Sequence, residues 1–191
     1  MVRIFLIRHG EPAGAWGVVD DPGLTERGHA QARAAAETIA GFGPLVLVSS
    51  PLRRCRETAE PSAQMLRQPC GIDPKVAEVR TPQGLTDRRA WLQRNFAWRK
   101  DTPPVLWSSL EPETRAWRDE CLRAANDWTH DVAVFTHFIF INALVGAAMK
   151  SEQTVVCHPD HASITELVRE NGDLKLVKLG AQMQNVASEA R

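Results

Sequence analysis

The stretch Val2–Glu11 reads VRIFLIRHGE and carries the strongest indication of both the fold and the chemistry of this chain. Its apolar run, Val2–Ile7, predicts a short buried strand. Arg8 and His9 follow directly, so both side chains are expected at the carboxyl end of that strand. A guanidinium can grip two oxygens of a phosphate group, and a neutral imidazole is a nucleophile. The stretch therefore predicts chemistry on a phosphoryl group, although Arg-His-Gly alone is short enough to occur by chance.

Beyond this strand, predicted strands and helices alternate, which is typical of an α/β fold with a largely parallel central sheet. Further strands are predicted at residues 45–48 and 132–136, and a closing hairpin at 164–168 and 174–179 turns at Asn171-Gly172. Helices are predicted from an N-cap at Thr25 to residue 40, after Pro51, on both sides of residues 102–104, and up to Met149.

Length and charge limit the possible partners. The 191 residues are enough for one well-buried domain, and a single domain is predicted over residues 1–191. The 23 basic and 23 acidic residues cancel, which argues against nucleic acid or an anionic membrane as a partner. Any anion site must therefore be formed by a few converging side chains.

The cysteines and the longest uncharged stretch indicate the compartment. The 4 cysteines lie far apart without a Cys-x-x-Cys pair, which, with no secretory leader, predicts free thiols in a reducing cytoplasm. Val132–Met149 carries no Asp, Glu, Lys or Arg and reaches the lower limit for a membrane span. It divides into a β-rich half and a helix-prone half on either side of His137. A buried strand followed by a buried helix therefore explains it better than a membrane span does.

Two more segments place candidate anion ligands at the same edge of the sheet. Residues 49–59 put several arginines in the first turns of a helix, where free N–H groups and the helix dipole favour anions. Arg53 and Arg56 are interpreted as solvated. His137 ends a buried strand as His9 does, and ligands of open α/β sheets bind at the carboxyl ends of the strands. Two histidines and two arginines are thus expected around one phosphate.

In this order the segments resemble the histidine phosphatase superfamily, which includes the cofactor-dependent phosphoglycerate mutases and many small phosphatases. Residues 8–11 match its R-H-G-[EQ] signature, and residues 24–28 match its L-T-x-x-G helix start. Residues 50–59 match S-P-L-x-R-x-x-x-T-A, and Thr136-His137 occupies the place of the second histidine. The resemblance covers nearly the whole chain.

The resemblance implies a three-layer α/β/α sandwich with a small helical lid, and a phosphohistidine intermediate on His9. It also implies Arg8, Arg54 and His137 as phosphate ligands, Glu78 as general acid and then base, and Thr25, Glu11 and His161 as further substrate-binding residues. For Glu11, capping of the following turn is an equal alternative. The scheme requires no metal ion and no other cofactor.

Two positions depart from the family pattern. Phe138 stands where the family has a glycine after the second histidine, so the backbone there is expected to approach phosphate less freely. Residues 12–16 (PAGAW) replace a small polar residue that hydrogen-bonds the phosphoryl group. That role falls to Thr25 or to a backbone amide.

Two regions leave alternatives open. Residues 80–130 hold most of the tryptophans among several arginines, either as the core of a helical subdomain, as favoured for Trp117 and Trp128, or as a lid that sets substrate choice. His158 and His161 look like a metal pair, but Pro159 between them predicts a turn, and no further ligands complete a site. His161 is instead expected at the mouth of the phosphate site.

These features predict a metal-independent phosphomonoester hydrolase that acts on a small phosphorylated metabolite. A mutase of the phosphoglycerate type and a phospho-ligand binding protein with little turnover are the alternatives. The chain is shorter than those mutases and shows no counterpart of their extended substrate segments, and binding alone requires neither a nucleophile nor an acid. No oligomeric state is predicted.

Overall fold

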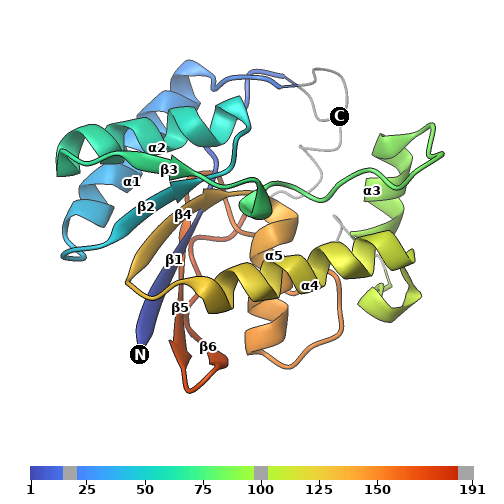
Figure 1. Ribbon diagram of the computed structural model, residues 1–191. Helices are drawn as coiled ribbons and strands as arrows, with labels where there is room; N and C mark the ends of the chain where they lie inside the picture. Colours follow the sequence, from blue (N-terminus) through green and yellow to red (C-terminus); the bar gives the residue numbers. More distant parts are fainter. Residues whose placement is uncertain (15–20, 97–102, 185–191) are drawn as a thin grey trace.

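A six-stranded sheet forms the centre of the computed structural model, which describes residues 1–14, 21–96 and 103–184 (Figure 1). The strands are β1 (Val2–Arg8), β2 (Val46–Ser49), β3 (Cys70–Ile72), β4 (Val132–Thr136), β5 (Ile164–Glu170) and β6 (Asp173–Lys178). Their order across the sheet is β3-β2-β4-β1-β5-β6. The strands from β3 to β1 are parallel, whereas β5 pairs antiparallel with both β1 and β6. The predicted α/β fold with a largely parallel sheet is confirmed.

Helices cover both faces of this sheet. They are α1 (Glu26–Ala40), α2 (Arg53–Leu66), α3 (Arg88–Asn95), α4 (Pro112–Asp127) and α5 (Phe138–Ala148), with short 3-10 turns η1 (Pro74–Val76) and η2 (Trp107–Ser109). α1 and α2 pack together on one face, and α4 and α5 lie on the other (Figure 1). The three-layer α/β/α sandwich is therefore confirmed. Among the described helices, none combines the length and the apolar character that crossing a bilayer requires.

Side chains of β1 alternate between the two cores that hold the layers together. Phe5 and Ile7 belong to the core with α1 and α2, whereas Ile4 and Leu6 belong to the larger core with α4 and α5. Successive side chains of a strand point to opposite faces of the sheet. A strand covered on both sides must then be apolar at nearly every position, which explains why the sequence of β1 shows no alternation.

Local sequence signals located several element ends correctly. Thr25 is the N-cap of α1, and its hydroxyl accepts from the N–H of Gly28 at 2.9 Å. Asn171 and Gly172 have φ values of 52° and 88°, the pair of left-handed residues that a type I′ hairpin turn requires. The helix after Pro51 begins only at Arg53.

The strand β3 was not predicted. It has three residues, contains a glycine, and lies mostly exposed at the edge of the sheet, where it pairs with β2. So short a segment offers no alternation that a sequence pattern could reveal. Its place is decided by β2, which presents an unpaired edge to it.

The segment between β3 and β4 contains α3 and α4 on either side of residues 102–104, as predicted. Four of its aromatic rings pack against one another in the core that also holds α5: Trp91, Phe96, Trp107 and Trp117. Each of these four residues is at most 5% exposed. Trp128 packs against that core in a partly buried position. Trp117 and Trp128 thus fill a core, as predicted, but this core is shared with the sheet and α5 and is not that of a separate helical subdomain. Trp98 lies outside the described residues.

The start of α1 packs against the turn after β1 without room for a side chain. A Cβ on Gly28 would lie 2.3 Å from the carbonyl oxygen of Glu11, and one on Gly10 would lie 2.6 Å from the carbonyl oxygen of Gly28. The two glycines therefore allow the backbones to touch directly. This contact holds α1 against the end of β1 that carries His9.

Gly28→Ala is expected to lower the free energy of unfolding by about 1–3 kcal/mol, because the added methyl group forces α1 away from Glu11. Gly146→Ala is the matched control. Gly146 is also a buried helical residue, but a Cβ there would find its nearest atom at 3.6 Å, so stability should stay constant or rise by up to about 1 kcal/mol. Urea unfolding measures both variants, and equal midpoints would contradict the close packing at Gly28.

Candidate active site

The carboxyl ends of β1 and β4 lie side by side and bring two histidines together. Arg8 of β1 is in register with Thr136 of β4, so His9 and His137 follow at the same edge of the sheet. The centroids of the two imidazole rings are 5.4 Å apart. Arg54 reaches them from the start of α2, and its Nη2 donates to Nδ1 of His137 at 3.1 Å. The two histidines and two arginines expected around one phosphate thus meet in one cluster, in which each is at most 7% exposed.

The hydrogen bond of His9 decides which ring nitrogen can react. Its Nδ1 lies 2.8 Å from the carbonyl oxygen of Gly10, and a carbonyl only accepts, so Nδ1 carries the proton. Nε2 is then the nitrogen with the lone pair. Burial, together with the charges of Arg54 and Arg8, holds the pKa of His9 well below its ordinary value of 6.5. His9 is therefore a neutral imidazole at neutral pH, with Nε2 as its nucleophilic atom.

His137 is held in the opposite tautomer. Arg54 can only donate, so Nδ1 of His137 accepts, and Nε2 then donates to the hydroxyl oxygen of Ser50 at 2.8 Å. Burial and the charges of Arg54 and Arg8 lower the pKa of His137 as well. Ser50 was not singled out from the sequence, although the motif S-P-L contains it. The ring of His137 is thus fixed from two sides by residues of one motif.

Arg8 is held by residues far away in the sequence. Its Nη1 donates to the carbonyl oxygen of Pro159 at 3.0 Å and lies 3.2 Å from Sδ of Met183. Its guanidinium also lies over the ring of Phe138, 5.5 Å from the centroid. Phe138, the departure from the family glycine, is therefore a packing partner of Arg8. The roles of Pro159 and Met183 have no sequence signal, because they come from contacts between distant segments.

Glu78 is a carboxyl group in a buried position next to this cluster. It follows η1 and is 8% exposed, and its Oε1 accepts from the N–H of Val79 at 3.0 Å. Burial raises the pKa of Glu78 above its ordinary value of 4.5, against the opposing effects of the Val79 N–H and of the Arg54 and Arg88 charges. A carboxyl group that keeps its proton to a higher pH is suited to donate it.

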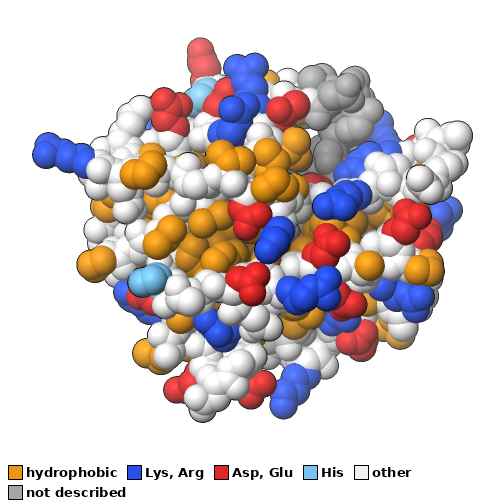
Figure 2. All heavy atoms as spheres, in the orientation of Figure 1, with side chains coloured by type: hydrophobic (Ala, Val, Ile, Leu, Met, Phe, Trp, Pro, Cys, Tyr) orange, Lys and Arg blue, Asp and Glu red, His pale blue; other side chains and the backbone are white. Residues whose placement is uncertain are grey.

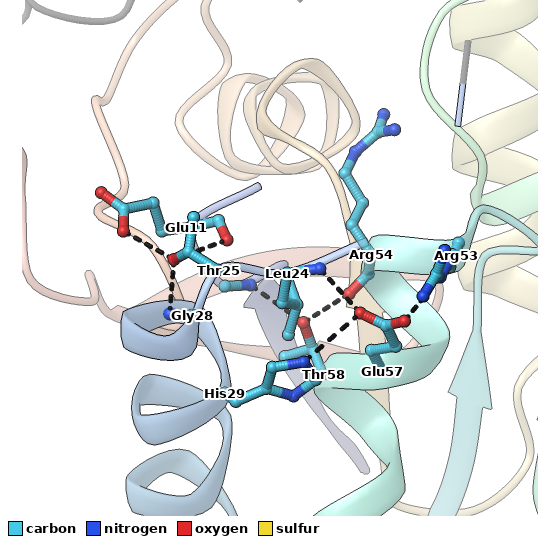
Figure 3. A network of polar contacts seen from close by, with 10 residues as sticks. Glu11, Leu24, Thr25, Gly28, His29, Arg53, Arg54, Glu57 and Thr58 are labelled. Carbon is cyan, nitrogen blue, oxygen red and sulfur yellow. Dashed lines mark hydrogen bonds and ion pairs between the residues drawn. The ribbon is translucent and has the colours of Figure 1, made fainter. Parts of the chain in front are cut away.

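The three further candidates differ in what they contact. The hydroxyl of Thr25 donates to Oε2 of Glu11 at 2.7 Å while it caps α1 through Gly28 (Figure 3). The carboxylate of Glu11 is therefore held at the start of α1 by the hydroxyl that caps this helix. His161 lies beside the buried cluster, since the centroid of its ring is 5.8 Å from that of the His9 ring.

A network of polar contacts joins α1 and α2 behind the cluster (Figure 3). The hydroxyl oxygen of Thr58 accepts from the N–H of Gly10 at 2.9 Å and donates to the carbonyl oxygen of Arg54 at 2.6 Å. On the exposed side, Glu57 pairs with Nε of Arg53 at 2.6 Å. Arg53 is thus exposed, as interpreted from the sequence, and forms a surface ion pair, whereas the guanidinium of Arg54 points away from the network.

Thr58→Val should destabilise the protein by about 1–3 kcal/mol, because the buried N–H of Gly10 loses its acceptor while the side-chain volume stays nearly constant. Thr58→Ser keeps the hydroxyl and should retain most of the stability. Thermal unfolding of both variants measures the difference. If Thr58→Ser lost as much as Thr58→Val, the missing methyl group and not the hydrogen bond would be responsible.

The buried cluster concentrates positive charge, unlike the one face of the surface that Figure 2 draws. On the face drawn in Figure 2, basic and acidic side chains are interspersed, without one large patch of either sign. Arg8 and Arg54 instead place their charges side by side with the two histidines. Within residues 1–14, 21–96 and 103–184, no group of three or more His, Cys, Asp or Glu side chains is arranged to hold a metal ion. The arrangement is suited to bind a small anion and to attack it with His9.

Known proteins share these sequence features. The family model of the histidine phosphatase superfamily (branch 1) matches residues 4–182. A glucosyl-3-phosphoglycerate phosphatase of Mycolicibacterium vanbaalenii is 37% identical over 123 residues, which cover 59% of this chain and 53% of that protein. A probable phosphoglycerate mutase of Proteus mirabilis is 34% identical over 109 residues, covering 52% of this chain and 49% of that protein. The chain thus spans about half the length of the curated relatives it matches.

The likeness in structure extends further than the likeness in sequence. A mycobacterial glucosyl-3-phosphoglycerate phosphatase, solved in complex with inorganic phosphate, superposes with a TM-score of 0.67 at 25% identity. The superposition covers 95% of this chain and 98% of the other. Together with the match over residues 4–182, these findings establish that the chain belongs to the histidine phosphatase superfamily, branch 1.

Proposed function

We propose that this protein is a phosphatase that hydrolyses small phosphomonoesters through a phosphohistidine formed on His9. The observation that carries the proposal is the hydrogen bond from Nδ1 of His9 to the carbonyl oxygen of Gly10, which leaves Nε2 as the nucleophilic atom. This atom belongs to a ring that lies beside Arg54, Arg8 and His137 in a buried cluster. Binding alone would not need a neutral, oriented imidazole at the centre of the cationic groups.

In the first step, Nε2 of His9 attacks the phosphorus atom in line with the bond to the leaving group. The bond from phosphorus to the ester oxygen breaks, and the carboxyl group of Glu78 gives its proton to that oxygen. In the second step, water attacks the phosphohistidine while the carboxylate of Glu78 takes a proton from it. Inorganic phosphate then leaves, and His9 is again neutral.

Arg8, Arg54 and His137 hold the non-bridging oxygens and offset the charge that accumulates in the transition state. In the described structure Nη2 of Arg54 donates to Nδ1 of His137, so phosphate would take over this guanidinium donor. His137 would donate to phosphate once Nδ1 carries a proton. His161 is proposed at the mouth of the site, where it would meet the part of the substrate beyond phosphorus. Thr25 and Glu11, whose side chains are hydrogen-bonded to each other at the start of α1, are proposed as further substrate-binding residues.

The substrate is proposed to be a small phosphorylated metabolite. The named function of the Mycolicibacterium vanbaalenii relative makes a phosphorylated sugar acid the first compound to test. Neither nucleic acid nor a membrane is proposed as a partner, since the 23 basic and 23 acidic residues balance. A cytoplasmic location is proposed because Cys55, Cys70, Cys121 and Cys157 are all free thiols.

The test is phosphate release by EDTA-treated protein from p-nitrophenyl phosphate, phosphoserine, 3-phosphoglycerate and glucosyl-3-phosphoglycerate. Turnover with inorganic phosphate as the product supports the phosphatase. The Proteus mirabilis relative favours a second candidate, a phosphoglycerate mutase, which would move the phosphoryl group between phosphoglycerates with little release. Tight phosphate binding by calorimetry without turnover of any compound would contradict both and indicate a binding protein.

A further inference from the structure

Arg88 is an arginine of α3 that lies against the segment following Glu78. Its Nη2 donates to the carbonyl oxygen of Val79 at 2.8 Å, and its Nη1 donates to the hydroxyl oxygen of Thr81. The planar guanidinium thus uses two of its donors on two residues of one short stretch. Residues 79–81 are neither helix nor strand, so contacts of this kind determine their path.

Val79 connects Arg88 to the acid. The N–H of Val79 donates to Oε1 of Glu78, its side chain is 1% exposed, and its carbonyl accepts from Arg88. The residue is therefore fixed at its amide, its side chain and its carbonyl. If the hold on the carbonyl were removed, the N–H that orients the carboxyl group of Glu78 would also be free to turn.

Charged and titratable groups reach Glu78 from several packed elements. Arg54 of α2 and Arg88 of α3 contribute positive charge. The backbone N–H of Ile139, at the start of α5, donates toward the carboxyl group of Glu78. The thiols of Cys55 and Cys121 also lie near this carboxyl group. Arg88 is partly buried, so its charge is screened less by water than that of a surface arginine. Removal of this charge leaves Arg54 as the remaining cation among these groups.

We propose that Arg88 is a positioning residue for Glu78, which holds the acid toward the leaving group and joins α3 to the proton-transfer step. The inference rests on the proposed function, in which Glu78 is the general acid. It goes beyond that function because it makes a residue of the segment 80–130 part of the acid step. The tryptophans of that segment then support a functional element in addition to filling a core.

The experiment compares Arg88→Gln, Arg88→Lys and the control Arg94→Gln, which changes an exposed arginine of the same helix. Each is assayed on an alkyl phosphomonoester, whose leaving group needs a proton, and on p-nitrophenyl phosphate, whose leaving group does not. Arg88→Gln should lower kcat on the alkyl ester about 10-fold or more, and on p-nitrophenyl phosphate by less than about 3-fold. KM should stay nearly constant for both, and Arg94→Gln should match the wild type.

The pH profile separates positioning from a merely structural role. Without the Arg88 charge, Glu78 keeps its proton to a higher pH, so the alkaline limb of kcat for the alkyl ester should move to higher pH in Arg88→Gln. Arg88→Lys keeps the charge but loses the paired hydrogen bonds to Val79 and Thr81. For this variant kcat should fall, while the alkaline limb of the pH profile stays in place. Thr81→Val, which removes only one acceptor, should repeat the leaving-group dependence to a smaller degree and serves if Arg88→Gln does not fold.

Two failures can be told apart. In the first case, the loss of kcat in Glu78→Gln depends on the leaving group. Arg88→Gln and Thr81→Val, however, lower kcat equally on the alkyl ester and on p-nitrophenyl phosphate, and the alkaline limb of the pH profile does not move. The inference is then overturned, while the proposed function stands. If Glu78→Gln itself loses both activities equally, Glu78 is not the acid. In that case the proposed mechanism and the inference fall together.

Discussion

His9→Ala should lower kcat for p-nitrophenyl phosphate at least about 10⁴-fold, because no other atom in the cluster is prepared to form the bond to phosphorus. His137 cannot substitute for it, since its Nδ1 accepts from Arg54 and its Nε2 donates to Ser50. Initial rates of EDTA-treated wild type and variant measure the loss. Quenching of wild type with labelled substrate in alkaline detergent should in addition trap a phosphohistidine, whose P–N bond survives in base, and the variant should lack it.

The variant should still fold and still bind inorganic phosphate, because Arg8, Arg54 and His137 remain in place. Calorimetry with inorganic phosphate tests this directly. His130→Ala, a change at an exposed histidine of the described chain, is the matched control and should leave turnover unchanged. Retention of wild-type activity in His9→Ala would remove the nucleophile from the proposed mechanism altogether.

Glu78→Gln should lower kcat about 10²–10⁴-fold for alkyl phosphomonoesters and much less for p-nitrophenyl phosphate. Glutamine keeps the shape of the side chain but cannot deliver a proton to an alkoxide, whereas nitrophenolate leaves without one. Paired kcat values on the two substrates measure the difference. Glu60→Gln, at an exposed position of α2, is the control, and its kcat should match that of the wild type on both substrates.

The pH dependence follows from two pKa shifts in opposite directions. With ordinary values, His9 is neutral only above 6.5 and Glu78 is protonated only below 4.5, so few molecules would hold both active forms. Burial lowers the first pKa and raises the second, which opens a pH range in which both forms coexist. The wild-type profile should therefore be bell-shaped, and Glu78→Gln should lose its alkaline limb. An unchanged alkaline limb would assign that limb to another group.

The same shift bears on stability. Because the pKa of Glu78 in the folded protein is raised, its ionisation opposes folding as the pH rises through that value. Glutamine does not titrate, so Glu78→Gln should be at least as stable as the wild type on the alkaline side. Loss of activity together with retained stability would separate the chemical role of Glu78 from a packing role.

Local chemistry made much of this fold and of its central residues predictable. A strand that is covered on both faces must be apolar, and polar residues at its end must then lie at the edge of the sheet, as Arg8 and His9 do. His137 follows the same rule on β4. Thr25 as N-cap and Asn171-Gly172 as the turn are decided within a few residues, which is why the sequence located them correctly.

The contacts that orient the site were less accessible, because they join segments far apart in the chain. Pro159 and Met183 approach Arg8 only after the sheet has formed, and neither carries a motif. Phe138 looked like an obstacle to phosphate when judged by its position after His137. In the fold it is a ring beside a guanidinium, a relation that no local pattern expresses.

The central place of β1 has a consequence for biosynthesis. The ribosome makes this strand before the other strands of the sheet, yet its partners are β4 and β5, so Ile4 must wait for Val132 and Val2 must wait for Arg169. Until then the nascent chain carries an apolar strand with two unpaired edges, while α1 and α2 can already form as helices from local contacts. Such late, long-range pairing slows folding and leaves the early chain prone to aggregation. The proposed nucleophile, His9, is thus translated before β4 and β5, but its surroundings are complete only when those strands of the sheet have been made.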